Sequence, residues 1–179
     1  MKPIDLLQRY CQGNEALLEV LTVHSRKVAD KALKLAAKHP ELNLDLKFVE
    51  EAALLHDIGI VRCNAPSIHC YGEYPYVCHG YLGADILRSE GLPQHALVAE
   101  RHTGTGLQHD YIVEQGLPLP LDRLYEPVSL EEQLICYADK YYSKTHLYEE
   151  KSPERVEASL EKWGDASAER FRAWRKIFD

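Results

Sequence analysis

The stretch Ala53–Ile60, ALLHDIGI, places a histidine and an aspartate side by side within an apolar run. Neighbouring side chains on a helix point about 100° apart, so both polar groups lie close to the apolar face of the segment. An unpaired carboxylate in such surroundings costs several kcal/mol. The fold must therefore bring compensating partners to His56 and Asp57, and the rest of the chain indicates which groups these are.

Helical periodicity dominates the sequence around this stretch. Asn14 can cap a long helix that ends near His39, and Asp45 or Asn43 can start a second helix that runs through His56 and stops at Gly59. No convincing strand alternation appears, so we expect an all-α fold. Further helices are predicted at about 77–90 and 94–102, after the capping box of Ser129 and Glu132 as far as Tyr142, and as a C-terminal pair within 152–179.

Two segments break this periodicity. Val61–Cys78 is a long loop rich in tyrosine and proline, and Leu107–Val128 is a loop with room for one short helix after Gln108. Long loops in compact domains are usually functional or disordered. The aromatic residues Trp163, Phe171 and Trp174 are expected to dock the last two helices onto the core.

Composition limits the class of protein. A chain of 179 residues suits one domain, and a formal net charge of −7 argues against a general nucleic-acid or anionic-membrane surface. No run approaches the roughly 18 apolar residues of a membrane span, and the N-terminus lacks the features of a secretory signal. The five cysteines are odd in number and show no C-x-x-C spacing, which disfavours a disulfide framework and a cysteine-ligated zinc. These features favour a cytoplasmic protein.

Several titratable residues occupy positions where a helix stripe calls for an apolar side chain. A single histidine of this kind is usually a hydrogen-bonded core residue, but so many buried groups on separate helices all need partners. Four imidazoles and two carboxylates form a satisfied set if divalent metal lies between them. These predicted ligands are His24, His56, Asp57, His79, His102 and Asp139.

The type and number of these side chains indicate which metals would bind. Mixed nitrogen and oxygen ligands suit iron, manganese, zinc, cobalt or nickel, and magnesium less well. Six side chains exceed the needs of one structural site, which favours two ions. Asp57 could then bridge both ions while His56 binds one of them.

The ordered set resembles the HD superfamily of metal-dependent phosphohydrolases, and LHDIG matches its HDIG subset. The resemblance covers about Thr22 to Lys140. It is supported by the segments CHGYLGADILRSEGLP, AERHTGTG and EEQLICYADK, which are also similar to small HDIG proteins and, more distantly, to the HD-type symmetrical diadenosine tetraphosphate hydrolases. It implies a single HD domain over residues 1–179, with a metal-binding core at about 14–148 and C-terminal helices at about 152–179.

The resemblance also implies the roles of individual residues. His24, His56, Asp57 and Asp139 would bind one metal, and His79 and His102, with Asp57 bridging, would bind the second. The nucleophile would be a metal-bridging hydroxide. The Gly-Tyr-Pro signature of cyclic dinucleotide phosphodiesterases does not follow His102, and Ile58-Gly59 replaces the acidic residues of the alarmone hydrolases. Both of those substrates are therefore disfavoured.

Cationic and hydroxyl residues next to the predicted ligands are candidates for substrate contacts. Lys140 directly follows a ligand and matches the Ala-Asp-Lys segment of the family, so we predict that it is catalytic together with Asp57. Each of the others could equally be an ordinary solvated or ion-paired side chain. The predicted substrate-binding residues are Arg62, Arg101, Thr103 and Lys144.

The leading hypothesis is a phosphohydrolase that acts on a phosphate ester or anhydride of a small molecule, and a nucleotide is the favoured substrate. A non-catalytic HD-fold module that senses a ligand is a second hypothesis, and an HD-type di-iron oxygenase is a third. We expect no nucleic-acid polymer and no membrane as partner. The sequence leaves open whether two chains form a homodimer.

Overall fold

Four side chains start helices at the positions that the sequence predicts. In the computed structural model, which describes residues 2–179, Asn14, Asp45, Ser129 and Ser152 each accept a hydrogen bond from the backbone N–H three residues further on. Each cap satisfies one of the N–H groups that a helix leaves unpaired at its start. The resulting helices are α1 (Pro3–Tyr10), α2 (Glu15–Ala36), α3 (Leu46–Leu55), α4 (His79–Ser89), α5 (Pro93–Arg101), α6 (His109–Glu114), α7 (Leu130–Asp139), α8 (Pro153–Leu160) and α9 (Asp165–Phe178).

The all-α expectation is confirmed, with two local differences. The sequence analysis did not predict α1, which buries Leu6 and Leu7. It also found no strands, which is wrong for one small antiparallel ladder of β1 (Asn64–Ala65) and β2 (Cys70–Tyr71). Strands of two residues are too short to show the alternation that identifies a strand. Short 3-10 helices occupy Pro40–Leu42, Ile58–Arg62, Pro66–Ile68, Tyr76–Cys78 and Glu161–Trp163.

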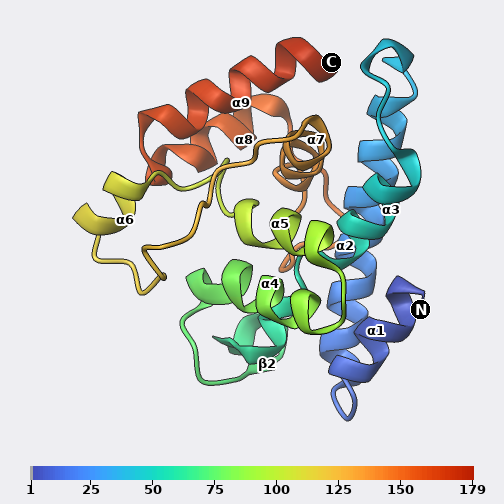
Figure 1. Cartoon of the computed structure of the whole chain (residues 1–179), viewed down its shortest axis with the longest axis vertical. Coiled ribbons are helices and arrows are strands. Elements are labelled where there is room, and N and C mark those ends of the chain that lie inside the picture. Colours follow the sequence, from blue (N-terminus) through green and yellow to red (C-terminus); the bar gives the residue numbers. More distant parts are fainter. Residues whose placement is uncertain (1) are drawn as a thin grey trace.

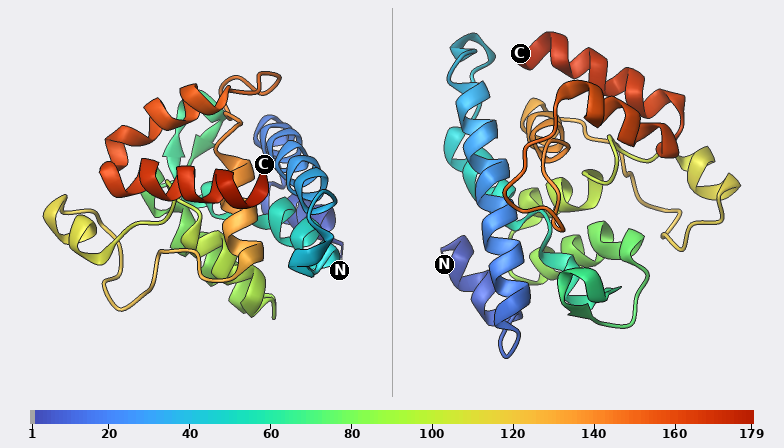
Figure 2. Two further views of the ribbon diagram at one scale, coloured as in Figure 1. Left: turned by 90° about the horizontal axis from the view of Figure 1, so that it is seen from above. Right: turned by 180° about the vertical axis from the view of Figure 1, so that it is seen from behind.

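The long helix α2 runs along one side of the molecule, with α1 against one end and α3 packed alongside it (Figure 1). Fully buried small residues on α2, such as Ala29 and Ala32, allow this close packing. Helices α4 and α5 form a second packed pair beside α3, and α7 lies between that pair and α2. The C-terminal helices α8 and α9 cover one end of α7 (Figure 2).

Gly59 has a different role from the predicted one. We expected it to stop the second helix, but α3 already ends at Leu55 and Gly59 lies inside the following 3-10 turn. A Cβ atom at Gly59 would collide with the backbone of His79 and Gly83 on α4. Glycine is therefore required here because it lets the turn after α3 touch α4, which brings His79 towards the His56–Asp57 pair.

Candidate metal centre

The six predicted ligands are all buried and meet in one place. None has more than 7% of its surface exposed. Four of them lie at or just beyond the C-terminal ends of α3, α5 and α7, where the negative end of the helix dipole favours a cation. The residues are His24 in the middle of α2, His56 and Asp57 after α3, His79 at the start of α4, His102 after α5, and Asp139 at the end of α7.

The first group consists of His24, His56, Asp57 and Asp139. Asp57 Oδ2 lies 3.1 Å from the Nε2 atoms of both His24 and His56. Asp139 Oδ1 lies 2.9 Å from His24 Nε2 and 3.4 Å from His56 Nε2. These potential ligand atoms all lie within 4.8 Å of one another, a spacing that is compatible with a single metal ion.

The second group shares Asp57 with the first. Asp57 Oδ1, the other carboxylate oxygen, lies 3.6 Å from His79 Nε2 and 3.3 Å from His102 Nε2. Each oxygen of Asp57 thus faces a different set of imidazoles. This is the arrangement that a carboxylate bridging two ions requires.

Backbone carbonyls fix the protonation of three of the histidine rings. The Nδ1–H of His56, His79 and His102 donates to the carbonyl of the residue three positions earlier, at 2.6, 2.6 and 2.7 Å. A carbonyl oxygen can only accept, so Nδ1 carries a proton in each ring, and in the neutral rings of His79 and His102 the Nε2 atom presents a lone pair. Hydrogen bonds of this kind orient metal-binding histidines.

Acceptor atoms therefore face other acceptor atoms. His79 Nε2 and His102 Nε2 lie 2.9 Å apart. Within the described chain, His56 Nε2 and Asp57 Oδ1 are buried without a hydrogen-bond partner, while Asp57 Oδ2 forms an ion pair with Lys144 at 2.7 Å. Such groups are costly to bury, and a divalent cation among them would satisfy all of them. The residues present thus fit a metal site.

A sequence model of the HD domain matches residues 21–143, the segment that carries all six residues. The chain belongs to the HD domain family. An uncharacterised protein of Methanocaldococcus jannaschii is 35% identical over 141 residues, which cover 77% of this chain and 72% of that protein.

Other relatives carry an HD-like segment in a longer chain. A tRNA (cytidine(56)-2'-O)-methyltransferase of Thermoplasma volcanium is 31% identical over 78% of this chain but only 35% of its own length. The corresponding enzyme of Picrophilus torridus is 28% identical over 72% of this chain and 33% of its own length. This chain thus spans about a third of each methyltransferase.

Among solved structures, the HD domain of the L. monocytogenes phosphodiesterase PgpH in complex with cyclic-di-AMP has the same fold. The TM-score is 0.55 at 18% sequence identity, and the match covers 94% of this chain and 92% of that one. A structure of the PgpH HD domain described without that ligand gives the same TM-score. The all-α HD fold is therefore shown on structural grounds as well.

Two lysines lie against the carboxylates of the centre. Lys144 Nζ lies 2.7 Å from Asp57 Oδ2, and Lys140 Nζ lies 2.8 Å from Asp139 Oδ2 and donates to the His102 carbonyl at 2.9 Å. Burial disfavours a charged His56 ring, but Asp57 and Asp139 outweigh burial and raise the pKa of His56 to about 9, so without a metal ion the ring is charged. Burial also disfavours the charged Asp57 carboxylate, but charged His56 and Lys144 outweigh burial and hold the pKa of Asp57 well below its usual range. Asp57 is therefore ionised and ready to bind a cation.

The imidazoles of the second group favour the neutral form. Burial, reinforced by neighbouring His102, lowers the pKa of His79 to about 3. Burial also lowers the pKa of His102, although Asp57 opposes this change. Neutral imidazole is the form that binds metal.

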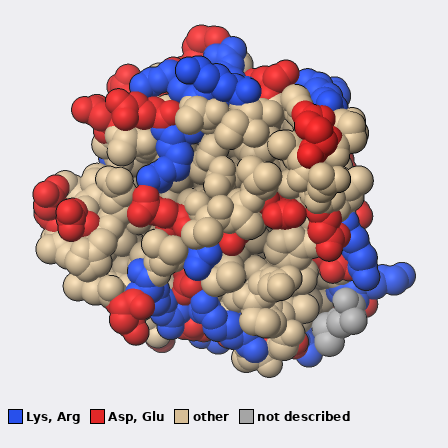
Figure 3. All heavy atoms as spheres, turned by 45° about the horizontal axis from the view of Figure 1, so that its top comes forward, with Lys and Arg blue, Asp and Glu red and all other residues tan. Residues whose placement is uncertain are grey.

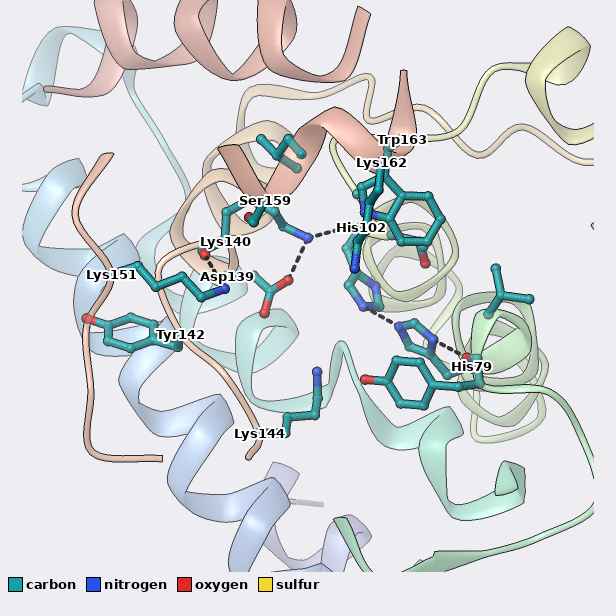
Figure 4. Close-up of a pocket in the computed structure, with 15 residues that line it drawn as sticks. His79, His102, Asp139, Lys140, Tyr142, Lys144, Lys151, Ser159, Lys162 and Trp163 are labelled. Carbon is teal, nitrogen blue, oxygen red and sulfur yellow. Dashed lines mark hydrogen bonds and ion pairs between the residues drawn. The ribbon is translucent and has the colours of Figure 1, made fainter. Parts of the chain in front are cut away.

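A pocket of about 200 Å³ opens onto His79, His102 and Asp139 (Figure 4). Thr103, Lys140 and Lys144 line it, and their roles in substrate binding and catalysis stay predictions. The other two predicted substrate-binding residues are elsewhere. Arg62 is exposed and does not line the pocket, and Arg101 Nη1 donates to both carboxylate oxygens of Glu132, at 3.2 and 3.0 Å.

Part of the pocket wall is not predictable from the sequence. Lys151 and Lys162 line the pocket, and so does Trp163, which we had expected only to dock the last helices. Trp163 is half-buried and packs against the core, but its indole also lies against Gly104 at the pocket. No local signal marks these residues, because lysines outside the apolar stripes usually contact only solvent.

Proposed function

We propose that this HD domain protein is a metal-dependent phosphohydrolase that cleaves a phosphate ester or anhydride of a small molecule, and that the molecule is a nucleotide. The observation that carries the proposal is the buried set of facing acceptors at the floor of a lysine-lined pocket. Metal ions on one side and ammonium groups on the other suit a phosphoryl group. A single HD domain over residues 1–179 is part of this proposal.

In this proposal His24, His56, Asp57 and Asp139 hold one ion, and Asp57, His79 and His102 hold a second. Iron, manganese, zinc, cobalt or nickel suits these ligands better than magnesium. When bound, such ions activate water for attack on phosphorus and polarise the phosphoryl oxygens.

The chain itself holds and orients the reacting groups. The ammonium groups of Lys140 and Lys144 lie at the pocket, where each contacts one carboxylate of the metal centre. Each can therefore also bind a phosphoryl oxygen of the substrate. Their positive charge offsets the negative charge that grows in the transition state. Thr103 borders the same pocket and can orient the substrate.

The distribution of charge supports a small substrate over a polymer. Basic and acidic side chains alternate over the face shown in Figure 3 rather than forming one basic field. The net charge of −7 agrees with this view. None of the helices in residues 2–179 has the length and apolarity to cross a bilayer.

The similar structures support a nucleotide as the class of substrate, but they do not indicate which nucleotide. The PgpH HD domain was solved with cyclic-di-AMP, and at 18% identity the likeness extends to the fold alone. Because no Gly-Tyr-Pro follows His102 in this chain, we propose a nucleotide other than a cyclic dinucleotide.

A substrate screen with metal-loaded protein tests the proposal. Protein purified without chelator would be analysed for bound metals and then incubated with a panel of nucleotides while released phosphate is measured. We expect release from at least one nucleotide, lost in Asp57→Asn and retained in a surface control such as Lys38→Gln. Metal binding without turnover on any phosphate compound would instead favour a ligand-sensing module, and oxygen uptake would favour an oxygenase.

A further inference from the structure

The outer wall of the pocket contains two lysines that the catalytic proposal does not use. Lys151 and Lys162, together with Ser159 and Trp163, line the pocket and lie beyond residues 21–143, the segment matched by the HD domain. They come from the segment before α8 and from the 3-10 turn after it. This wall therefore lies outside the matched family segment.

All four lysines of the pocket converge on its mouth. In Figure 4, Lys140, Lys144, Lys151 and Lys162 approach the space beside Asp139 and His102 from different sides. Lys140 and Lys144 each contact a carboxylate, at 2.8 and 2.7 Å. Within residues 2–179, by contrast, neither Lys151 nor Lys162 forms an ion pair with a carboxylate. The inner pair of ammonium groups is thus compensated and the outer pair is not.

Hydrogen bonds to neighbouring segments fix the positions of Lys151 and Lys162. The Lys151 N–H donates to the Tyr141 carbonyl at 2.8 Å, and Lys151 Nζ lies 3.4 Å from the Lys140 carbonyl. The Lys162 carbonyl accepts a hydrogen bond from the Tyr111 hydroxyl at 2.9 Å. Burial lowers the pKa of Lys151; the charge of Asp139 opposes this effect, and the nearby Lys140 and Lys162 add to it. An anion between these lysines would relieve the crowding of like charges.

The pocket also has room for more than one phosphoryl group. A hollow of about 550 Å³ adjoins it, and Lys144, Lys151 and Lys162 line both. The metal ions and the two inner lysines, Lys140 and Lys144, would balance the negative charge of a single phosphoryl group at the metal centre. The outer pair would then lie beside the next part of the substrate.

We propose that Lys151 and Lys162 form a second anion subsite, which holds a phosphoryl group adjacent to the one that is hydrolysed. This inference rests on the proposed phosphohydrolase function and narrows its substrate to compounds with a phosphoanhydride chain, such as nucleoside di- or triphosphates. The hydrolysed bond is then the P–O bond of the terminal phosphoryl group: water supplies the new oxygen, and the remaining phosphate chain leaves with the bridging oxygen.

Binding of inorganic ions tests the subsite without requiring turnover. Calorimetry on metal-loaded protein would compare inorganic phosphate with pyrophosphate, in the wild type and in Lys151→Gln/Lys162→Gln. We expect the wild type to prefer pyrophosphate, and the double variant to lose about tenfold in pyrophosphate affinity with less than threefold change for phosphate. The matched control is Lys38→Gln/Lys47→Gln, which removes the same charge from exposed positions away from the pocket.

Kinetics provide the second measure. With ADP as substrate, the double variant should raise KM about tenfold and leave kcat and metal content nearly unchanged. If the double variant kept the wild-type preference for pyrophosphate over phosphate, the subsite proposal would be wrong, whether or not the protein hydrolyses ADP. Absence of turnover on any phosphate compound, with lysine-dependent pyrophosphate binding intact, would overturn the phosphohydrolase proposal and leave the subsite standing. If the double variant fails to fold, Lys162→Gln alone, at an exposed position, should still weaken pyrophosphate binding about threefold.

Discussion

Two clusters of buried charge lie in this protein, and they are built differently. In one, Glu100 is 3% exposed and accepts hydrogen bonds from Arg88 at 2.6 and 3.1 Å and from Arg123 at 3.0 Å, while Arg123 also donates to Asp85. Every carboxylate there faces a donor. In the metal centre Lys144 and Lys140 each contact one carboxylate oxygen. Asp57 Oδ1 and the Nε2 atoms of His79 and His102, however, face one another with no donor from residues 2–179 between them. Burial of charge alone therefore does not identify a ligand site, whereas a shortage of donors does.

Asp57→Asn should have the largest effect, because Asp57 is shared by both ligand groups. We expect loss of bound metal and a fall in phosphohydrolase activity of at least about 100-fold, above the 10–100-fold typical of removing a residue that only supports a ligand. Elemental analysis and phosphate release measure the two effects. Full metal content in this variant would show that the shared carboxylate is not a ligand.

Removal of metal should destabilise the protein, since the ligands converge only in the folded state. An ion present at about 100 times its Kd stabilises the fold by about 2.7 kcal/mol, so a chelator should lower Tm by about 5–10 °C. Thermal unfolding with and without chelator measures this shift. The shift should vanish in Asp57→Asn, and an equal shift in that variant would contradict the assignment of the ligands.

Glu100→Ala should break the other cluster without affecting the metal. It leaves Arg88 and Arg123 without their shared carboxylate, and we expect a loss of about 2 kcal/mol of unfolding free energy. This figure is below that of a fully buried pair because the two arginine side chains are 38% and 27% exposed. Denaturant unfolding measures the loss, and unchanged metal content is the decisive comparison with Asp57→Asn.

The smallest effect is expected at the cysteines, because the metal centre uses nitrogen and oxygen ligands only. All five are buried free thiols. Burial raises the pKa of Cys63 and of Cys136 to about 12, so at pH 8 only about one molecule in ten thousand carries the reactive thiolate at either residue. Alkylation at pH 8 should therefore be negligible in the native protein, as measured by mass spectrometry. Labelling that appears only after chelation would indicate a thiolate ligand.

Local chemistry made the helices and the six converging residues predictable. Caps such as Asn14 and Ser129 act within three residues, and a histidine on an apolar stripe must point into the core. The convergence itself was inferred from the need of each group for a partner. The metals and the catalytic roles of these residues stay predictions.

Features that depend on distant segments were not predictable in the same way. Arg101 is adjacent to His102 in sequence, but a helix turns neighbouring side chains apart, and Arg101 contacts Glu132. Lys151 and Lys162 reach the pocket only because the segment around α8 folds back over it. Nothing within either local segment encodes that contact.

The carbonyl partners of the histidine rings have an evolutionary consequence. The atoms that aim His56, His79 and His102 belong to the main chain, and any amino acid that maintains the helical turn supplies them. During evolution the side chains that precede each histidine can therefore be exchanged without changing the orientation of its ring. Specificity for new compounds can then arise in the surrounding wall while the reactive core is inherited intact.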